Sequence, residues 1–329
     1  MHRFHELPDE EKVSLYERLG HKALASYGLE DAPVRCLKQG ESVVFEVGSS
    51  SSEETHFALR LCSPDQDLDA LKRELLWLSA IRRDTGLEVP EPILARTGDF
   101  YRMTSVEGVP GRHAAVLFRW VGGTILDEDL SRDHTVRLGR WIATLHNHAR
   151  GFGWPIELEP MHIEPSNAEA MIDEALLADC LSSAEIDVFR DAAVFVSEAL
   201  VSLGSGPESA GPIHGRIKGQ NILFGEDTLG VIGFSGCTWG RFLGDVAVTC
   251  AWLAKRQEGE ILQDALLGGY GSVRDLPENL PEILRVFGAY GILRNTVREL
   301  GGNRPSPDAP RPYRLEQALA RLQILTHAE

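Results

Sequence analysis

The chain has 329 residues, 43% hydrophobic and 25% charged, which suffices for one large domain or two lobes with a sizeable core. Its 33 basic and 49 acidic side chains give a net charge of −16, so most of the surface would repel nucleic-acid phosphates. The sequence has no apolar run of about 18 residues for a membrane span, no apolar N-terminal signal, and its five cysteines form no CxxC pair. We therefore predict a soluble, cytoplasmic globular protein without nucleic-acid or membrane partners.

The N-terminal part of the sequence predicts a small sheet with helices. A helix with Leu71, Leu75 and Leu78 at helical spacing is the clearest element, and a serine-rich tract at Ser49–Glu54 predicts an exposed hairpin loop. In chain order, we expect a helix over Pro8–Tyr27, strands over Val34–Leu37, Ser42–Val47 and His56–Cys62, a helix over Leu68–Arg82, and a strand over His113–Val121.

The remainder of the sequence is mostly helical in pattern. Predicted helices cover Thr135–Ala149, Ala168–Ala178 and Ser183–Leu203, and further helices follow from Gly244, with a Pro- and Arg-rich break at Asn303–Tyr313. Between the two groups of helices lie short predicted strands at Gly211–His214, Ile222–Phe224 and Leu229–Phe234. This order predicts a sheet-bearing N-terminal lobe, a linking strand and a mainly helical C-terminal lobe.

Five sequence strings, in their order and spacing, carry a resemblance. They are FALRLCSP at Phe57–Pro64, VPEPI at Val89–Ile93, FRWVGG at Phe118–Gly123, LGRWIATLH at Leu138–His146, and IHGRIKGQNILFGEDTLGVIGFSGCTWGRFLGDVA at Ile213–Ala247. Over residues 34–300 the sequence resembles the aminoglycoside phosphotransferase and choline kinase family, which has a protein-kinase-like fold. The resemblance implies an α+β fold with an N-terminal lobe over 1–117 that carries an antiparallel sheet and one αC-like helix. A hinge over 118–123 and a helical C-terminal lobe over 124–329 would follow, with the catalytic loop at 213–236.

The resemblance also implies a nucleotide-binding side. In the family a basic strand residue, commonly Lys, grips the nucleotide α/β-phosphates and is held by a glutamate on the next helix; here these positions are Arg60 and Glu74. Arginine differs from lysine because its planar fork favours bidentate contacts. A surface ion pair on a charged helix face is the alternative interpretation. The nucleotide-covering loop would lie at Gly40-Glu41-Ser42, and the strand over His113–Val121 would lead to the adenine-binding hinge.

The catalytic loop departs from the family pattern at two positions. In phosphoryl transfer an aspartate deprotonates the acceptor hydroxyl, while an Asn and a second Asp hold Mg²⁺. The family's H-G-D-x-x-x-x-N corresponds to His214–Asn221 here, with Arg216 at the base position, and its I-D-F-D-D corresponds to Ile232–Gly236, with Gly233 at the metal position. Arginine cannot accept a proton near pH 7 and glycine has no ligand atom. Asn221 alone remains, so ordinary Mg-ATP kinase activity is not expected.

Other residues in this region are expected to support the loop. The resemblance implies that Asp245 braces the catalytic loop from the next helix, that His214 anchors it, and that Trp239 packs. Neighbouring positions differ from the family too: Lys218 stands where His is common, and Ser235 and Gly236 replace acidic residues. The whole site therefore looks rebuilt rather than altered at one position.

The sequence leaves the role of the altered loop open. Arg216 and Lys218 either point to solvent or nearby carboxylates, or bind an anion in place of magnesium. Three functions follow: a pseudokinase that binds ATP, another nucleotide or an anionic small molecule without a well-formed Mg²⁺ site; a repurposed enzyme using Arg216, Lys218, His214 or Cys237; or a residual ATP-dependent phosphotransferase using Glu226 or Asp227. These last two residues instead fit an ordinary hairpin turn.

Acidic segments and possible metal ligands add little to this prediction. Leu126–Asp129 and Met171–Glu174 could line a site for a cationic acceptor, or they are solvated helix faces. No HExxH motif or Cys/His cluster has the spacing of metal ligands, and the two histidines of His146-Asn147-His148 face different directions on a helix. The partner expected is therefore a small molecule, and the sequence does not indicate an oligomeric state.

Overall fold

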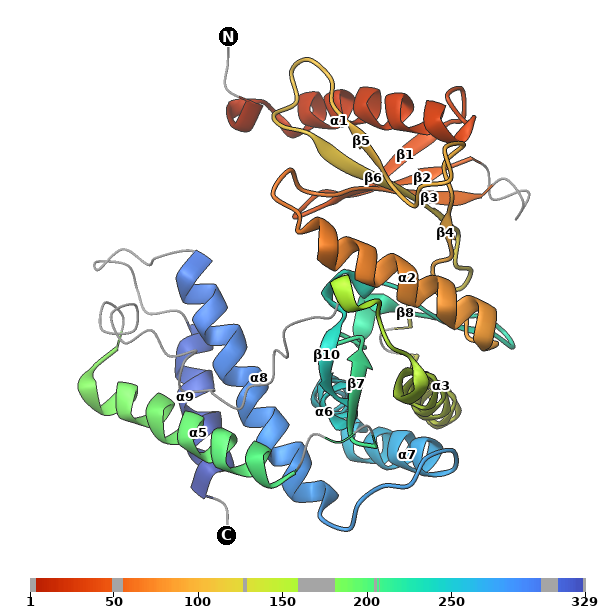
Figure 1. The fold of residues 1–329 in the computed structure, drawn as a ribbon. Coiled ribbons are helices and arrows are strands. Elements are labelled where there is room, and N and C mark those ends of the chain that lie inside the picture. The colour runs from red at the N-terminus through yellow and green to blue at the C-terminus, as the bar shows by residue number, and fades with distance from the viewer. Residues whose placement is uncertain are drawn as a thin grey trace. The chain divides into compact units, whose positions relative to one another are not determined.

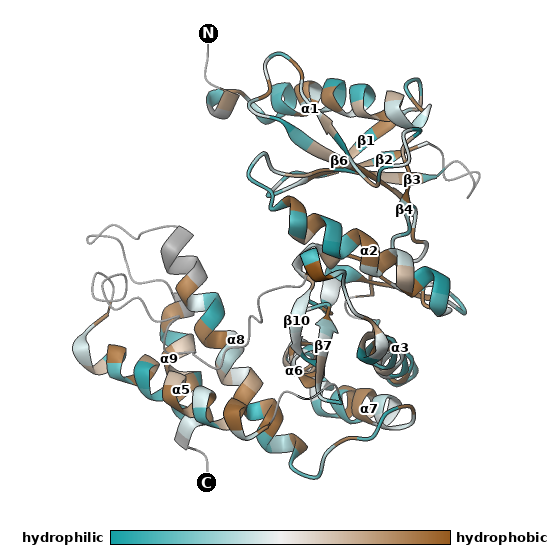
Figure 2. Ribbon diagram, viewed as in Figure 1, coloured by the Kyte–Doolittle hydropathy of each residue, from teal (hydrophilic) through white to brown (hydrophobic). Residues whose placement is uncertain are grey.

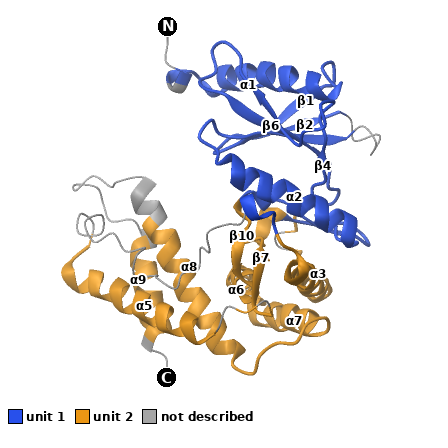
Figure 3. Ribbon diagram, viewed as in Figure 1, with its two compact units in different colours: residues 1–124, 154–159, 222–235 blue, residues 125–153, 160–221, 236–329 orange. Residues whose placement is uncertain are grey.

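The computed structural model describes residues 4–48, 56–126, 129–158, 181–203, 206, 208–302 and 313–327. The chain divides into two compact units: residues 1–124, 154–159 and 222–235 form the first, and residues 125–153, 160–221 and 236–329 form the second (Figure 3). The hairpin loop expected at Ser49–Glu54, the helix expected over Ala168–Ala178, and nearly all of the break at Asn303–Tyr313 lie outside the described residues. The acidic segment Met171–Glu174 and part of Leu126–Asp129 lie outside them as well.

The first unit is built on a six-stranded antiparallel sheet, as the sequence predicted for the N-terminal part (Figure 1). The strand order is β1-β2-β3-β6-β4, and β5 pairs with β6 beside β4. The strands are β1 (Val34–Lys38), β2 (Val43–Val47), β3 (Phe57–Leu61), β4 (Pro92–Ile93), β5 (Arg102–Thr104) and β6 (His113–Arg119). The sequence missed β4 and β5, because two or three residues are too few to display the period of a strand.

Two helices cover this sheet. One is α1 (Asp9–Leu24), which is continued by a 3-10 turn at Ala25–Tyr27, and its Leu19, Ala23 and Leu24 pack with buried residues of β2, β3 and β6. The other is α2 (Leu68–Asp84), along which hydrophobic and hydrophilic residues alternate (Figure 2). Its start is fixed by Asp67, whose carboxylate accepts hydrogen bonds from the backbone N–H groups of Asp69 and Ala70.

A hairpin from later in the chain completes the first unit. Strands β8 (Ile222–Phe224) and β9 (Leu229–Val231) join it because Thr124 and Phe224 exchange two backbone hydrogen bonds, of 2.9 and 2.8 Å, and Val231 N–H donates to the Glu88 carbonyl over 3.0 Å. The backbone at Gly123 has φ +118°, and a Cβ there would lie 3.1 Å from the backbone of Leu223 and Phe224. The sequence placed residues 222–235 with the C-terminal lobe, and these bridges explain the difference. The expected strand over Leu229–Phe234 ends at Val231, since Phe234–Gly236 forms a 3-10 turn.

The second unit is mainly helical. It contains α3 (Arg132–Gly151), α5 (Ser183–Ser202), α6 (Phe242–Leu253), α7 (Gly259–Gly271), α8 (Leu280–Gly302) and α9 (Tyr313–His327), together with the paired strands β7 (Ala210–Ile213) and β10 (Thr238–Arg241). Helices α5, α8 and α9 share one hydrophobic core. No helix in the described parts of the chain is long and apolar enough to span a membrane.

Helices α3 and α7 approach each other unusually closely, because glycines face across their contact. A Cβ on Gly139 would lie 2.1 Å from the Leu266 carbonyl oxygen, and a Cβ on Gly269 would lie 2.2 Å from the Val136 carbonyl oxygen. Side chains cannot occupy such distances, so both positions need glycine.

We expect Gly269→Ala to lower the free energy of unfolding by about 2–3 kcal/mol, because the new methyl group overpacks a contact made with backbone. The neighbouring Gly268 is the matched control, since a Cβ there meets no atom within 4 Å. Urea unfolding should show Gly268→Ala unchanged or up to about 1 kcal/mol more stable, as for an exposed helical glycine. Equal stabilities of the two variants would contradict the packing argument.

Candidate functional site

The basic residue of β3 and the glutamate of α2 form a buried bidentate ion pair. Arg60 donates from Nη1 to Glu74 Oε1 over 2.8 Å and from Nη2 to Glu74 Oε2 over 2.7 Å. Their side chains are only 12% and 5% exposed, so the pair is not the surface contact that the alternative interpretation required. Burial by itself would lower the pKa of Arg60, but the carboxylate of Glu74 outweighs it and the pKa is raised. The guanidinium is therefore fixed in its charged form.

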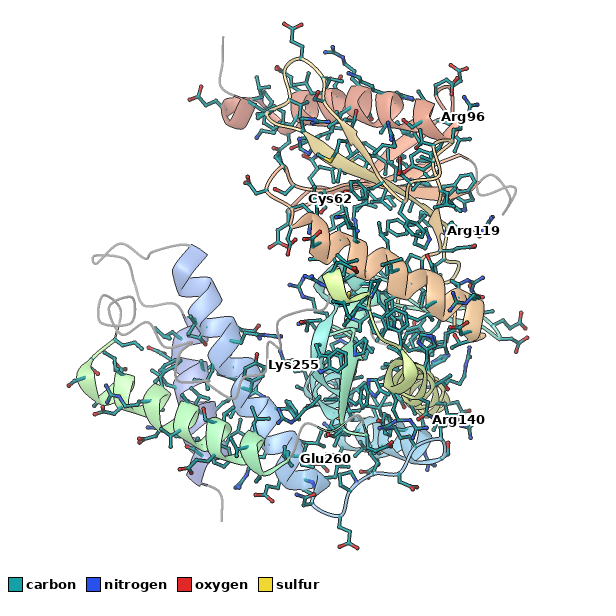
Figure 4. The ribbon with its side chains drawn as sticks, in the orientation of Figure 1. Cys62, Arg96, Arg119, Arg140, Lys255 and Glu260 are labelled. Carbon is teal, nitrogen blue, oxygen red and sulfur yellow. The ribbon has the colours of Figure 1, made fainter. Side chains whose placement is uncertain are left out.

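Two further groups surround this guanidinium. The ring of Phe118, on β6, lies with its centroid 5.1 Å from Arg60 Cζ, within the range of a cation–π contact. Cys62 lies at the end of β3 (Figure 4), where burial raises the pKa of its thiol although Arg60 opposes that shift. Within the described residues, Arg60 Nε is buried without a hydrogen-bond partner. The hydrogen bonds that the Arg60 side chain donates to carboxylate groups thus both go to Glu74.

The part of the expected catalytic loop that belongs to the second unit, residues 213–221, is held by one buried carboxylate. Asp245, in the first turn of α6, has no exposed surface. Its Oδ2 accepts the backbone N–H of His214 over 2.9 Å, and its Oδ1 accepts the backbone N–H of Gly215 over 2.6 Å. Burial alone would raise the pKa of Asp245, but the hydrogen bonds that its carboxylate accepts from the His146 ring and from the His214 backbone outweigh it, so the pKa is lowered. The prediction that Asp245 braces this loop is confirmed.

A buried histidine completes the support of Asp245. His146, on α3, lies 3.4 Å from Asp245 Oδ2 through Nε2 and 3.1 Å from the Tyr270 hydroxyl through Nδ1. Burial lowers the pKa of His146 although Asp245 opposes that shift, and burial raises the pKa of Tyr270. Tyr270 therefore keeps its proton and donates to Nδ1, and a neutral His146 donates from Nε2 to the carboxylate. The sequence missed this role of His146 and Tyr270, which lie 124 residues apart.

The backbone of the loop is fixed at several points. The fully buried His214 accepts the backbone N–H of Arg216 at Nδ1 over 3.1 Å, which makes this histidine an anchor, as expected. Thr249, on α6, donates to the Ile217 carbonyl over 2.8 Å. Asn221 donates from Nδ2 to the Arg216 carbonyl over 3.0 Å. The amide nitrogen of Asn221 therefore supports the loop, which leaves its Oδ1 as the atom that a cation would contact.

The side chain of Arg216 lies over a glycine rather than beside an acid. A Cβ built on Gly236 would be 3.2 Å from Arg216 Nε and 3.5 Å from Cδ, so the guanidinium runs along the bare backbone of Gly236. No carboxylate in the described parts of the chain forms an ion pair with half-buried Arg216. Lys218, two residues on, is exposed. The first interpretation of Arg216 allowed a side chain directed to solvent or to a nearby carboxylate, and a carboxylate partner is not seen among the described residues.

Gly233, which the resemblance places at the metal position, has an unusual backbone and no side-chain ligand. Gly233 has φ +87°, in the left-handed region, and it precedes Phe234, whose buried ring meets Trp77 of α2 edge-on at 5.6 Å. The structure describes no group of three His, Cys, Asp or Glu side chains able to hold a metal ion. Glu226 and Asp227 are exposed in the turn of the β8–β9 hairpin, as the sequence predicted for these residues.

The structure places the remaining predicted residues individually. Cys237 is half-buried just before β10, and Trp239 is half-buried within that strand. The residues of the nucleotide-covering loop, Gly40-Glu41-Ser42, form the turn between β1 and β2. In sum, the first unit brings Arg60 to Glu74, and the second brings His214, Arg216 and Asn221 together through backbone bonds.

We expect the free energy of unfolding to fall as pH drops below about 6.5, the ordinary pKa of an unfolded histidine, because the unfolded chain then binds a proton that buried His146 refuses. His146→Gln keeps a neutral donor but removes this titration, so its pH slope between 6.5 and the depressed native pKa should be smaller than in the wild type. Urea unfolding at a series of pH values measures the slope. His21→Gln, at a histidine outside this network, is the control, and an equal slope in all three proteins would refute the assignment.

Comparison with known proteins places this geometry in a family. The model of the phosphotransferase enzyme family matches residues 34–283, and no match was found among curated proteins. A microcompartment-associated aminopropanol kinase shares 23% identity at a TM-score of 0.72, covering 94% of this chain and 95% of that one. An amicoumacin kinase solved with AMP-PNP and Ca²⁺ shares 14% identity at a TM-score of 0.75, and the match covers 97% of this chain and 96% of that one. A choline/ethanolamine kinase family protein from Mesorhizobium loti shares 15% identity at a TM-score of 0.61, and the match covers 95% of each chain. These structures share the two-lobed kinase-like fold, and the chain belongs to the phosphotransferase enzyme family.

Proposed function

We propose that this protein is a pseudokinase of the phosphotransferase family, which binds a nucleotide or another anionic small molecule without transferring phosphate. The observation that carries the proposal is Arg216, a half-buried cation with no acidic partner in the described residues, at the position of the general base. A guanidinium donates hydrogen bonds and cannot accept a proton near neutral pH, so it binds oxyanions and does not activate a hydroxyl group.

The residues present do not fit the magnesium site that the family implies. Mg²⁺ requires oxygen ligands, commonly carboxylates, in near-octahedral geometry. Gly233 offers no side chain, Arg216 brings a repelling charge, and the described residues contain no cluster of three metal-ligating side chains. The single amide oxygen of Asn221 cannot by itself hold Mg²⁺. The lack of ligands supports a mode of anion binding in which cationic side chains take the place of the metal.

The ion pair between Arg60 and Glu74, at the positions that the resemblance assigns to nucleotide binding, supports the same proposal. The pair between Arg60 and Glu74 is buried and bidentate, and a buried charge persists at such a place only when it is well paired. Its geometry keeps a guanidinium at the strand position where the family carries the basic residue that contacts the phosphates. ATP is therefore the first candidate ligand.

The central experiment is calorimetric titration of ATP into the protein, once with Mg²⁺ and once with EDTA. We expect binding that persists in EDTA and that weakens at least about tenfold in Arg216→Ala, because a hydrogen-bonded charge pair is worth more than about 1.4 kcal/mol. Lys218→Ala should weaken binding less, since its ammonium is exposed. Lys255→Ala, at an exposed lysine beyond α6, is the control for net charge (Figure 4).

Other results would redirect the assignment. Binding that requires Mg²⁺ would favour the second candidate, a residual ATP-dependent phosphotransferase, which family membership itself supports. Absence of ATP binding under both conditions would exclude nucleotide as the ligand and leave other anionic small molecules.

We further expect the double variant Arg216→Asp and Gly233→Asp to acquire Mg²⁺-dependent ATP binding, because it restores carboxylates at the base and metal positions. The left-handed backbone at position 233 costs a non-glycine residue about 1–2 kcal/mol, and aspartate accepts it more readily than most residues. Arg216→Asp with Gly233→Asn is the matched control, since asparagine tolerates the same backbone without supplying charge. A folded double variant without Mg²⁺ dependence would show that more than these two positions separate the protein from an active kinase.

A further inference from the structure

A cavity of about 510 Å³ lies within the second unit, away from the catalytic loop. It is lined by the ends of α5 and α7, the starts of α6 and α8, and the segment before β7. It lies at one end of the strand pair β7–β10, where Arg241 lines it and pairs with Ala210. The loop begins at the other end, where Ile213, the residue before His214, pairs with Thr238. The cavity is thus a different place from the altered active site.

The cavity combines an apolar wall with two guanidinium groups. Phe242, Tyr270 and Ile283 are almost fully buried lining residues. The guanidinium of Arg274 lies 4.7 Å from the centroid of the Phe242 ring. Arg241 is 7% exposed and donates from Nη2 to the Leu200 carbonyl over 2.6 Å. The wall therefore offers both hydrophobic surface and positive charge.

The positive charge of Arg274 is not neutralised by an acid. Its Nη1 donates to the amide oxygen of Asn147 over 3.0 Å and its Nη2 donates to the backbone carbonyl of Glu208. The Glu208 carboxylate pairs instead with Arg150, at 2.9 Å, and the other acidic lining residue, Asp275, is exposed. In the described parts of the chain no carboxylate forms an ion pair with Arg274. A guanidinium in an apolar wall with neutral partners favours an anionic ligand group.

We propose that this cavity binds an amphipathic organic anion, with its carboxylate or phosphate beside Arg274 and Arg241 and its hydrocarbon or aryl body against Phe242 and Ile283. The volume falls within the range of about 300–1,000 Å³ that is usual for small-molecule sites. The proposal does not depend on the pseudokinase assignment, because no residue of the catalytic loop lines the cavity.

Contacts connect this site to the catalytic loop. Tyr270, a lining residue, bonds His146 through its hydroxyl, and Phe242, another lining residue, stacks on His146 with 4.9 Å between centroids. His146 in turn contacts Asp245, which holds the backbone N–H groups of His214 and Gly215. A ligand that packs on Tyr270 and Phe242 steadies both contacts of His146. It should therefore slow hydrogen exchange in the loop.

The binding test uses octanoate as the anionic probe, 1-octanol as the neutral chain of equal length, and acetate as the head group alone, each titrated calorimetrically. We expect octanoate to bind with one-to-one stoichiometry at least about tenfold more tightly than 1-octanol, because the charge-assisted hydrogen bond exceeds about 1.4 kcal/mol. Arg274→Gln should abolish that difference, and Leu276→Trp, which fills the cavity from its half-buried lining position, should prevent binding of both. Arg140→Gln, at an exposed arginine of α3 outside the lining (Figure 4), should bind as the wild type does.

The proposal would be overturned if octanoate bound no better than 1-octanol, or equally well to wild type and Arg274→Gln. Circular dichroism checks that each variant is folded, and the two variants act independently, so loss of one leaves the other as a test. Hydrogen-exchange mass spectrometry of the peptide containing His214–Arg216 then tests the connection: protection by octanoate in the wild type but not in Leu276→Trp supports it, and unchanged exchange at saturating octanoate refutes it.

Discussion

The buried carboxylate of Asp245 is the interaction on which the catalytic loop depends. A charge without exposed surface is costly unless it is fully hydrogen-bonded, and here the cost is offset by two backbone N–H groups and His146. All three partners act on the main chain of the loop or on Asp245 itself, and none requires a particular side chain at position 216. The backbone of the loop is therefore held independently of which side chain stands at position 216.

The residues around Arg216 leave room for its side chain. A side chain at residue 236 would require Arg216 to shift by a few tenths of an ångström, because a Cβ there would lie 3.2 Å from Nε. Gly233, which the resemblance places at the metal position, has a left-handed backbone that an aspartate also tolerates. The arginine and the glycine beneath it form one packing unit.

The sequence predicted those features that depend on local pattern. The leucine spacing of α2 and the apolar strands β2 and β3 were identified within two residues of their observed ends, and the resemblance paired Arg60 with Glu74 correctly. Contacts between distant segments left no such signal: His146 meets Asp245 across 99 residues and Tyr270 across 124. The attachment of β8 and β9 to the first unit rests on backbone bonds to Thr124 and Glu88, which are independent of side-chain type. The strand β10 pairs with β7 over only four residues, too few to show a period.

The distribution of positive charge explains why Arg216 is the first residue to test for anion recognition. Each unit carries an arginine at a position to which the resemblance assigns a catalytic role, yet the two arginines are not equivalent. Arg60 is matched by a bidentate carboxylate, so the pair as a whole is neutral, whereas no acid in the described residues offsets Arg216. The chain's net charge of −16 acts on an approaching anion mainly from beyond the Debye length of about 8 Å, where salt screens it. At contact distance the local guanidinium dominates, so a strongly acidic protein can still hold an anion at Arg216.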